Sequence, residues 1–176
     1  QGQKQWKGWG IVEIERKYLV KFMPDLSGAQ VKKIEQGYLC RKPVVRIRKS
    51  NVDYILTYKS RAGLSQDIAI KNEEVELPLT AEAYIHLKEK IDGELVMKTR
   101  YVLPLSDGKR AELDVFEGGL YGLVFVEVEF ETEAEAEAFE PPEWFGRDVS
   151  REEAFSNAYL SEVKSFEEWK KCFGGD

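Results

Sequence analysis

Alternation of polar and apolar side chains is the dominant pattern along this chain. In the segment VEIERKY, Glu13, Glu15 and Lys17 fall at every second position, and Ile14 lies between the two glutamates. Successive side chains of a β-strand point to opposite faces of a sheet, so each such segment predicts a strand with one charged face. The sequence predicts eight strands, over residues 10–20, 36–40, 44–50, 53–60, 72–79, 95–105, 109–117 and 123–131.

Turn and helix signals fill the intervals between these strands. An Asp-Gly pair in SDGK predicts a hairpin turn, and EGGL after the next strand interrupts the chain again. Ser150 with Glu153, and Ser165 with Glu168, have the spacing of helix capping boxes. Helices are therefore expected over residues 80–93, 132–139, 150–163 and 165–173, and the segment 26–34 is compatible with a short helical turn.

The polar faces of the predicted strands mostly carry charges of one sign. A solvated sheet with cross-strand ion pairs explains any one of these faces, but surface strands more often mix both signs. Closing the sheet would remove its exposed edges and enclose the charged face. The expected fold is therefore α+β, an eight-stranded antiparallel closed β-barrel with helices packed outside. The enclosed residues would be the acids Glu13, Glu15, Glu74, Glu76, Glu112, Asp114, Glu127 and Glu129, and the bases Lys17, Arg46, Arg48, Lys59, Lys98 and Arg100.

Length and composition fit one globular domain. The 176 residues are 43% apolar and 33% charged, a balance that excludes a disordered chain, and no apolar run is long enough to cross a membrane. We expect a single domain over residues 11–176, preceded by an extension at 1–10. Cys40 and Cys172 are far apart and lack the spacing of a zinc site, which fits a reducing, cytoplasmic setting.

Charge and chemistry narrow the expected partner. The formal net charge of −6 argues against binding of nucleic acid by bulk attraction, and no membrane partner is expected. The single histidine, His86, is expected on the surface of its helix, so the chemistry depends on carboxylates, Lys, Arg, Tyr or a metal held by oxygen atoms. Carboxylates suit Mg²⁺ or Mn²⁺, and arginines suit phosphate oxygens, so the expected partner is a small-molecule polyanion.

These motifs resemble those of a known family. The segment EIERKYLV carries an ExExK signature, and QGYL, VRIRKS, LTYKS, KTRYVLPL, ELDVFEG, LVFVEVEF and PPEWFGRDVS follow in the same order as in the short bacterial branch of the CYTH superfamily, the triphosphate tunnel metalloenzymes. The resemblance covers residues 11–161. It implies an eight-stranded antiparallel tunnel that hydrolyses phosphoanhydride bonds with Mg²⁺ or Mn²⁺.

The resemblance also implies roles for individual residues. Lys98 would orient or activate the attacking water, and Tyr38 would project towards the substrate. Glu112 and Asp114 would assist the metal or position water, and Glu74 and Glu76 are further candidates. Phe155, Ser156 and Asn157 stand where relatives often have Tyr-Lys-Asn, so one lysine contact is expected to be absent. The expected metal ligands are Glu13, Glu15, Asp114, Glu127 and Glu129, and the expected phosphate ligands are Lys17, Arg46, Arg48, Lys59 and Arg100.

The predicted activity is metal-dependent hydrolysis of a linear triphosphate, with inorganic tripolyphosphate as the favoured substrate. A class IV-type adenylate cyclase and a thiamine triphosphatase are alternatives within the superfamily, but those branches tend to carry a YFD-like strand where this chain has EQGYLC. A non-catalytic polyphosphate-binding module is the alternative from a different functional class. The sequence leaves both a monomer and a homodimer open.

Overall fold

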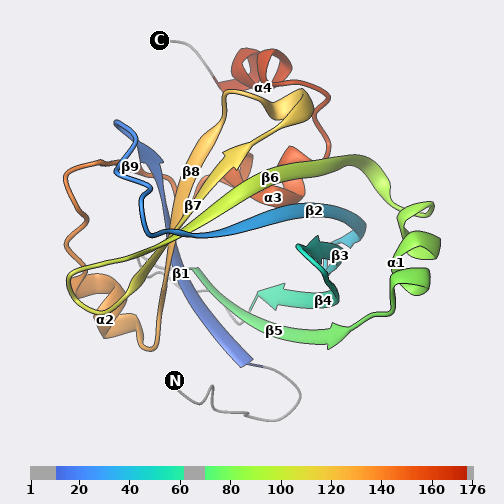
Figure 1. Ribbon diagram of the computed structural model, residues 1–176, viewed down its shortest axis with the longest axis horizontal. Coiled ribbons are helices and arrows are strands. Elements are labelled where there is room, and N and C mark those ends of the chain that lie inside the picture. The colour runs from blue at the N-terminus through green and yellow to red at the C-terminus, as the bar shows by residue number, and fades with distance from the viewer. Residues whose placement is uncertain (1–10, 62–69, 174–176) are drawn as a thin grey trace.

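The computed structural model describes residues 11–61 and 70–173. Within these residues, eight antiparallel strands close into a barrel, and a ninth short strand adds to β1 (Figure 1). The predicted α+β fold, a closed eight-stranded antiparallel barrel with helices outside, is confirmed. The strands are β1 (Ile11–Val20), β2 (Gln30–Arg41), β3 (Val44–Ser50), β4 (Asp53–Arg61), β5 (Ile70–Pro78), β6 (Asp92–Pro104), β7 (Arg110–Phe116), β8 (Val124–Phe130) and β9 (Phe145–Asp148).

The helical elements are short and lie outside the barrel or at its end. Thr80 caps the first helix by accepting a hydrogen bond from the backbone N–H of Ala83, and Thr132 caps the second in the same way through Glu135. The helices are α1 (Ala81–Lys88), α2 (Glu133–Ala138), α3 (Asn157–Leu160) and α4 (Phe166–Phe173), with 3₁₀ turns η1 (Gly118–Leu120) and η2 (Glu153–Phe155).

The first strand closes the barrel because it has a hydrogen-bonded neighbour on each edge. One edge pairs with β8, with Glu15 opposite Glu129 and Lys17 opposite Glu127. The other edge pairs with β5 near its start, where Ile11 lies opposite Glu74, and with β9 near its end. The strand order around the barrel is therefore β1, β5, β4, β3, β2, β6, β7 and β8.

Three expected helical segments differ from the structure, although the N-cap at Thr80 is confirmed. The turn expected within 26–34 is instead the start of β2 at Gln30, because that strand pairs with both β3 and β6. The helix expected to reach Gly93 ends at Lys88, and Gly93, with a positive φ of 74°, already belongs to β6. The helix expected over 150–163 is divided into η2 and α3.

The division of this last segment has a local cause. The Ser150 hydroxyl does not cap a helix, because it accepts a hydrogen bond from the backbone N–H of Lys17 at 2.8 Å and donates one to Asp148 Oδ1 at 2.5 Å. Ser156 instead caps α3, accepting from the backbone N–H of Tyr159 at 3.1 Å. The segment 149–162 is thus tied to the barrel at several points and runs along its end.

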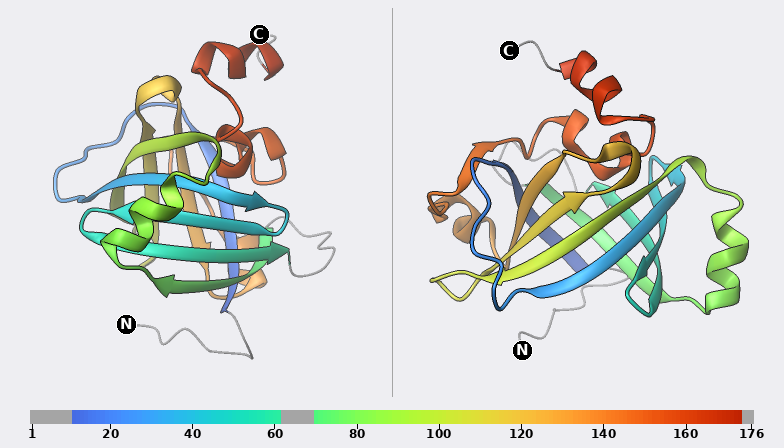
Figure 2. Two further views of the ribbon diagram at one scale, coloured as in Figure 1. Left: turned by 90° about the vertical axis from the view of Figure 1, so that its right-hand side faces the viewer. Right: turned by 45° about the horizontal axis from the view of Figure 1, so that its top comes forward.

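Aromatic packing seals one end of the barrel. Phe116 and Phe125 share the inner face of their strands with charged residues, and Phe155 of η2 packs edge-on against Phe125 with 5.4 Å between ring centroids. Trp169 of α4 packs on the other side of Phe155 at 5.1 Å and donates a hydrogen bond to Ala154 O. Figure 2 shows the helices that follow β9 gathered beside this end of the barrel.

A second hydrophobic cluster lies on the outer face of the sheet. Ile14, Val128 and Phe130 point away from the barrel interior and pack with Phe139 and Phe145 of the segment after β8. This packing fixes the register of β1 and β8, because a slip of one residue would turn the carboxylates outward. No helix among the described residues is long and apolar enough to cross a membrane. The expected extension at 1–10 lies outside the described residues.

Candidate active site

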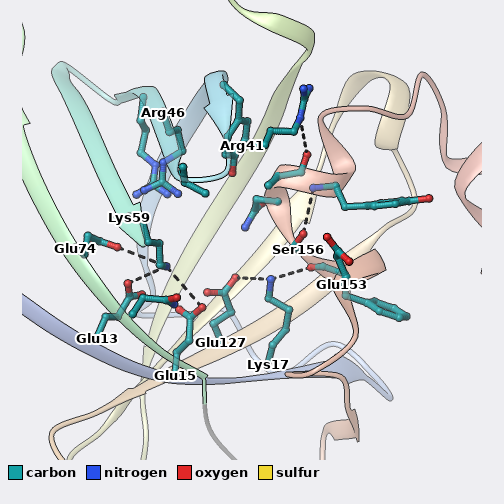
Figure 3. A pocket seen from close by; sticks show the side chains of 18 of the residues that line it. Glu13, Glu15, Lys17, Arg41, Arg46, Lys59, Glu74, Glu127, Glu153 and Ser156 are labelled. Carbon is teal, nitrogen blue, oxygen red and sulfur yellow. Dashed lines mark hydrogen bonds and ion pairs between the residues drawn. The ribbon is translucent and has the colours of Figure 1, made fainter. Parts of the chain in front are cut away.

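The barrel encloses a cavity of about 1220 Å³ lined mainly by charged side chains (Figure 3). Its walls come from the inner faces of the strands and from the segment 149–162. Two predicted site residues, Lys98 and Asp114, lie outside this lining. The predicted residues that the structure brings together around the cavity are Glu13, Glu15, Lys17, Tyr38, Arg46, Arg48, Lys59, Glu74, Glu76, Arg100, Glu112, Glu127 and Glu129.

Carboxylates converge on one cation at the acidic wall of the cavity. Lys59 Nζ lies 2.8 Å from Glu13 Oε2, 3.8 Å from Glu15 Oε1 and 3.5 Å from Glu74 Oε2. The three acids come from β1 and β5, and the lysine comes from β4, so the cluster spans three strands (Figure 3). One ammonium group faces three carboxylates, which leaves this wall with an excess of negative charge.

Burial and mutual repulsion disturb the ionisation of these acids. Burial raises the pKa of Glu13 to about 7, although Lys59 opposes the shift. Burial, followed by the charge of Glu13, raises the pKa of Glu15 well above its usual range. Burial alone would lower the pKa of Lys59, but the nearby carboxylates outweigh it and raise that pKa. The acidic wall would therefore be stabilised by further positive charge.

A second acidic position is neutralised more completely. Lys17 Nζ lies 3.3 Å from Glu127 Oε1 and donates a hydrogen bond to Phe155 O at 2.8 Å. Burial would raise the pKa of Glu127, but Lys17 and Arg100 outweigh it and hold that pKa well below its usual range. Glu129, two residues further along β8, also lines the cavity, and this residue is exposed.

Lys98 and Asp114 form a buried layer beside the cavity. Lys98 is 0% exposed, and its Nζ lies 2.5 Å from Asp114 Oδ2 and 3.1 Å from Asn157 Oδ1. Arg100 donates to both oxygens of Asp114, at 2.7 and 2.8 Å, and also pairs with Glu112. Burial lowers the pKa of Lys98 to about 8 despite the nearby Asp114 carboxylate. Lys98 therefore reaches the cavity lining through Asn157.

The opposite wall is cationic. Arg46 Nη2 donates to Thr57 Oγ1 at 3.3 Å, and Arg48 Nε donates to Gln36 Oε1 at 3.1 Å. Burial, followed by the positive charges of Arg46 and Arg100, lowers the pKa of Arg48 to about 10. Among the described residues neither Arg46 nor Arg48 forms an ion pair with a carboxylate. This wall therefore suits a ligand that brings its own negative charge.

The structure adds cavity residues that the sequence patterns did not single out as ligands. Arg41 lines the cavity and contacts Ser161 and Glu162, and Lys42 pairs with Glu153 at the rim. Lys32 also lines the cavity, because it shares the inner face of β2 with Tyr38. Extending the predicted strand to Gln30 would have revealed Lys32, whereas no periodic signal marks the contacts of Arg41.

A closed antiparallel barrel with an acidic wall facing a cationic wall defines a tunnel whose charges suit a polyanion. The family model of the CYTH domain matches residues 12–159 of this chain. The chain belongs to the CYTH family, as its resemblance to the triphosphate tunnel metalloenzymes predicted.

Two relatives are similar over nearly their whole lengths. An inorganic triphosphatase of Nitrosomonas europaea is 38% identical over 154 residues, which cover 86% of this chain and 97% of the relative. An inorganic triphosphatase of Acetivibrio thermocellus is 32% identical over 160 residues, which cover 89% of this chain and 98% of that relative. The sequence similarity therefore covers most of this chain.

Solved structures are similar in fold. The crystal structure of the inorganic triphosphatase NE1496 superposes with a TM-score of 0.66 at 36% identity, covering 90% of this chain and 99% of that one. The structure of the PH1012 protein from Pyrococcus horikoshii has a TM-score of 0.54 at 23% identity, covering 71% of this chain and 83% of that one. At this identity the similarity shows a shared fold alone.

Proposed function

We propose that this chain hydrolyses a phosphoanhydride bond of a linear triphosphate, with inorganic tripolyphosphate as substrate and Mg²⁺ or Mn²⁺ as cofactor. The observation that carries this proposal is the cationic wall, where Arg46 and Arg48 are hydrogen-bonded to neutral side chains inside the closed barrel. The opposite acidic wall, and two relatives named inorganic triphosphatase, support the same assignment.

The acidic wall fits a hard divalent cation in its chemistry. Glu13 and Glu15 supply buried oxygen donors, and the raised pKa of Glu13 indicates that added positive charge would stabilise its carboxylate. Within residues 11–61 and 70–173, no three His, Cys, Asp or Glu side chains form a ready-made ligand set, and Lys59 lies among the carboxylates instead. Glu13 and Glu15, joined by Glu127 and Glu129 across the β1–β8 pair, would hold the metal. When bound, the metal supplies charge neutralisation and polarises phosphate oxygens.

The cationic residues would bind and align the substrate. Arg46 and Arg48 each present a planar guanidinium group that matches two phosphate oxygens. Lys17 and Lys59 lie among the carboxylates, where each could also neutralise an oxygen of the phosphate chain. Positioning of this kind, together with stabilisation of charge that spreads over the phosphoryl oxygens, would supply most of the catalysis.

We assign Lys98 and Asp114 to positioning. Both oxygens of Asp114 accept hydrogen bonds from Arg100, and one also accepts from Lys98, so Asp114 orients these two cations. Asp114 is accordingly left out of the metal set. Lys98 holds the Asn157 side chain, which lines the cavity and can orient an attacking water through its amide. Lys98 would thus act through Asn157.

One experiment tests the proposed activity. The purified protein is incubated with tripolyphosphate, ATP or thiamine triphosphate, with Mg²⁺, Mn²⁺ or chelator, and released phosphate is measured. We expect turnover of tripolyphosphate well above that of ATP, dependence on the metal, and no cyclic AMP. Comparable rates for all three substrates would overturn the assignment to tripolyphosphate. Binding without turnover under every condition would identify a polyphosphate-binding module.

A further inference from the structure

Arg48 is held by the residue that lies opposite it in the neighbouring strand. Gln36 of β2 pairs with Arg48 of β3, and Gln36 Oε1 accepts a hydrogen bond from Arg48 Nε at 3.1 Å. Gln36 is 0% exposed, whereas Arg48 lines the cavity. The terminal nitrogens of Arg48, Nη1 and Nη2, form no hydrogen bond with the described residues. Gln36 therefore occupies one edge of the guanidinium group and leaves the terminal nitrogens to a ligand.

Another arginine of the barrel interior has a charged support at the equivalent place. Arg100 of β6 lies opposite Asp114 of β7 and donates hydrogen bonds to both of its oxygens, at 2.7 and 2.8 Å. Each arginine thus contacts its cross-strand partner, but the acceptor is a carboxylate for Arg100 and an amide for Arg48. The protein therefore neutralises Arg100 and leaves Arg48 with its full charge.

Arg46 is supported in the same way as Arg48. It lies opposite Thr57 of β4, which is 0% exposed, and its Nη2 donates to Thr57 Oγ1 at 3.3 Å. Both arginines of the cationic wall thus have a neutral and fully buried acceptor as cross-strand partner. A carboxylate in either place would form a buried ion pair and cancel the charge that the wall presents to the cavity.

The amide of Gln36 contributes little to the fold itself. Its Nε2 is buried and has no hydrogen-bond partner among the described residues. Its Oε1 supports a cation in an unfavourable place, because burial, followed by the charges of Arg46 and Arg100, lowers the pKa of Arg48 to about 10. An unpaired buried donor destabilises the folded state, and an apolar side chain of similar size would avoid that cost. Such a local conflict is expected where a residue serves function and not packing.

We propose that Gln36 is a positioning residue, which orients the Arg48 guanidinium at the cavity and leaves its charge free for a polyanion. This inference rests on the proposed function, because it is there that Arg48 binds the phosphate chain. Gln36 acts only through Arg48. Its oxygen fixes the orientation of the guanidinium group, and its lack of charge keeps the affinity of the cationic wall for an anion high.

The test measures the binding of tripolyphosphate by calorimetric titration in chelator. Gln36→Glu keeps the shape and the acceptor but adds a charge that pairs with Arg48, so Kd should rise about tenfold or more. Gln36→Met removes the acceptor but keeps the charge of Arg48, so only orientation is lost and Kd should rise on the order of threefold. Gln30→Glu is the matched control, because it makes the same change at an exposed position of the same strand, and it should bind as wild type. Equal Kd values for Gln36→Glu and the wild-type protein, or equal losses in Gln36→Glu and Gln36→Met, would overturn the proposal.

Thermal melts and a double variant separate positioning from a structural role. Without ligand, Gln36→Glu and Gln36→Met should melt at or above the wild-type midpoint, because the first gives Arg48 a counter-charge and the second removes the unpaired donor. In the Arg48→Ala background, Gln36→Met should change Kd by less than about twofold, since the residue through which Gln36 acts is gone. A lowered midpoint in both single variants, or a full further loss of affinity in that background, would assign Gln36 to the fold. If tripolyphosphate binds but is never hydrolysed, the proposed activity fails, and the Kd comparison still decides the role of Gln36.

Discussion

Lys59 Nζ lies 2.8 Å from Glu13 Oε2, and this ion pair joins β4 to β1 across the strand that separates them. Both side chains are largely buried, at 18% and 12% exposed. Because Glu15 and Glu74 share the same ammonium group, the pair is the centre of a cluster whose charge depends on one lysine.

Removing that lysine should destabilise the metal-free protein. Lys59→Met keeps the length of the side chain but leaves the carboxylates of Glu13, Glu15 and Glu74 without their shared cation. We expect a loss of about 3 kcal/mol in the free energy of unfolding, measured by urea denaturation in chelator. Added Mg²⁺ should recover part of this loss. The control is Lys71→Met, which breaks a half-exposed pair with Glu133 and should change stability by less than about 1 kcal/mol. If Lys59→Met had the same urea denaturation midpoint as the wild-type protein, the stabilising role of the cluster would be contradicted.

The raised pKa of Glu13 predicts how stability depends on pH. Glu13 titrates near 7 in the folded protein and near 4.5 in the unfolded chain, so the folded state binds more protons between these values. The stabilisation by this group is fully present below pH 4.5 and is lost as the pH rises through 7. Thermal melts in chelator should show a falling midpoint over this window, and Glu13→Gln should flatten the curve. A midpoint that rises across the same window in the wild-type protein would contradict the shifted pKa.

Arg48 should contribute to catalysis without stabilising the fold. Arg48→Ala removes a guanidinium group that we place on the substrate, and kcat/KM for tripolyphosphate should fall by about a hundredfold or more, on the order of 2–4 kcal/mol. Extra metal should not restore the rate. The melting temperature should stay level or rise, because burial and neighbouring cations already disfavour this charge. Lys49→Ala, on the outer face of the same strand, is the control and should keep full activity. A large loss of stability in Arg48→Ala would show that the arginine is structural.

Glu129 should affect the metal requirement. Glu129→Gln preserves the shape of the side chain but removes the charge that a hard cation needs, at a position opposite Glu15 on β1. We expect activity to fall by orders of magnitude and to recover in part only at much higher Mg²⁺ or Mn²⁺, measured by metal titration of the initial rate. Glu137→Gln on the exposed side of α2 should behave as wild type. Normal activity of Glu129→Gln at ordinary metal concentration would remove Glu129 from the metal set.

Alternation along the chain predicted the strands and their faces correctly where one face is charged and the other apolar. Arg46 and Arg48 line the cavity, and Ile47 between them is fully buried on the other side. The start of β2 has no such contrast, since apolar Ile34 faces inward with Lys32 while Val31 is half-exposed. Pairing with β3 and β6 keeps this segment extended. A local sequence pattern cannot predict pairing with strands that are distant in the sequence.

The alternation of polar and apolar residues does not predict how deeply each charged side chain is buried. Lys98 and Arg100 share the inner face of β6, and the sequence does not distinguish them. In the structure Arg100 lines the cavity, whereas Lys98 is covered by Asn157. That cover comes from a contact between residues 59 positions apart. The short strand β9 escaped prediction for a related reason, because its four residues have no periodicity and are held by pairing with β1.

The pairing of β1 also has a consequence for folding during protein synthesis. This strand leaves the ribosome before the other strands of the barrel, but its partners β5, β8 and β9 emerge later, so β1 gains its second neighbour only when β8 has been made. Until then Glu13 and Glu15 remain hydrated, and dehydration of the acidic wall is deferred to the final closure. Contacts so distant in sequence make that closure slow relative to local folding. A nascent chain that stops before β8 therefore keeps its glutamates in water.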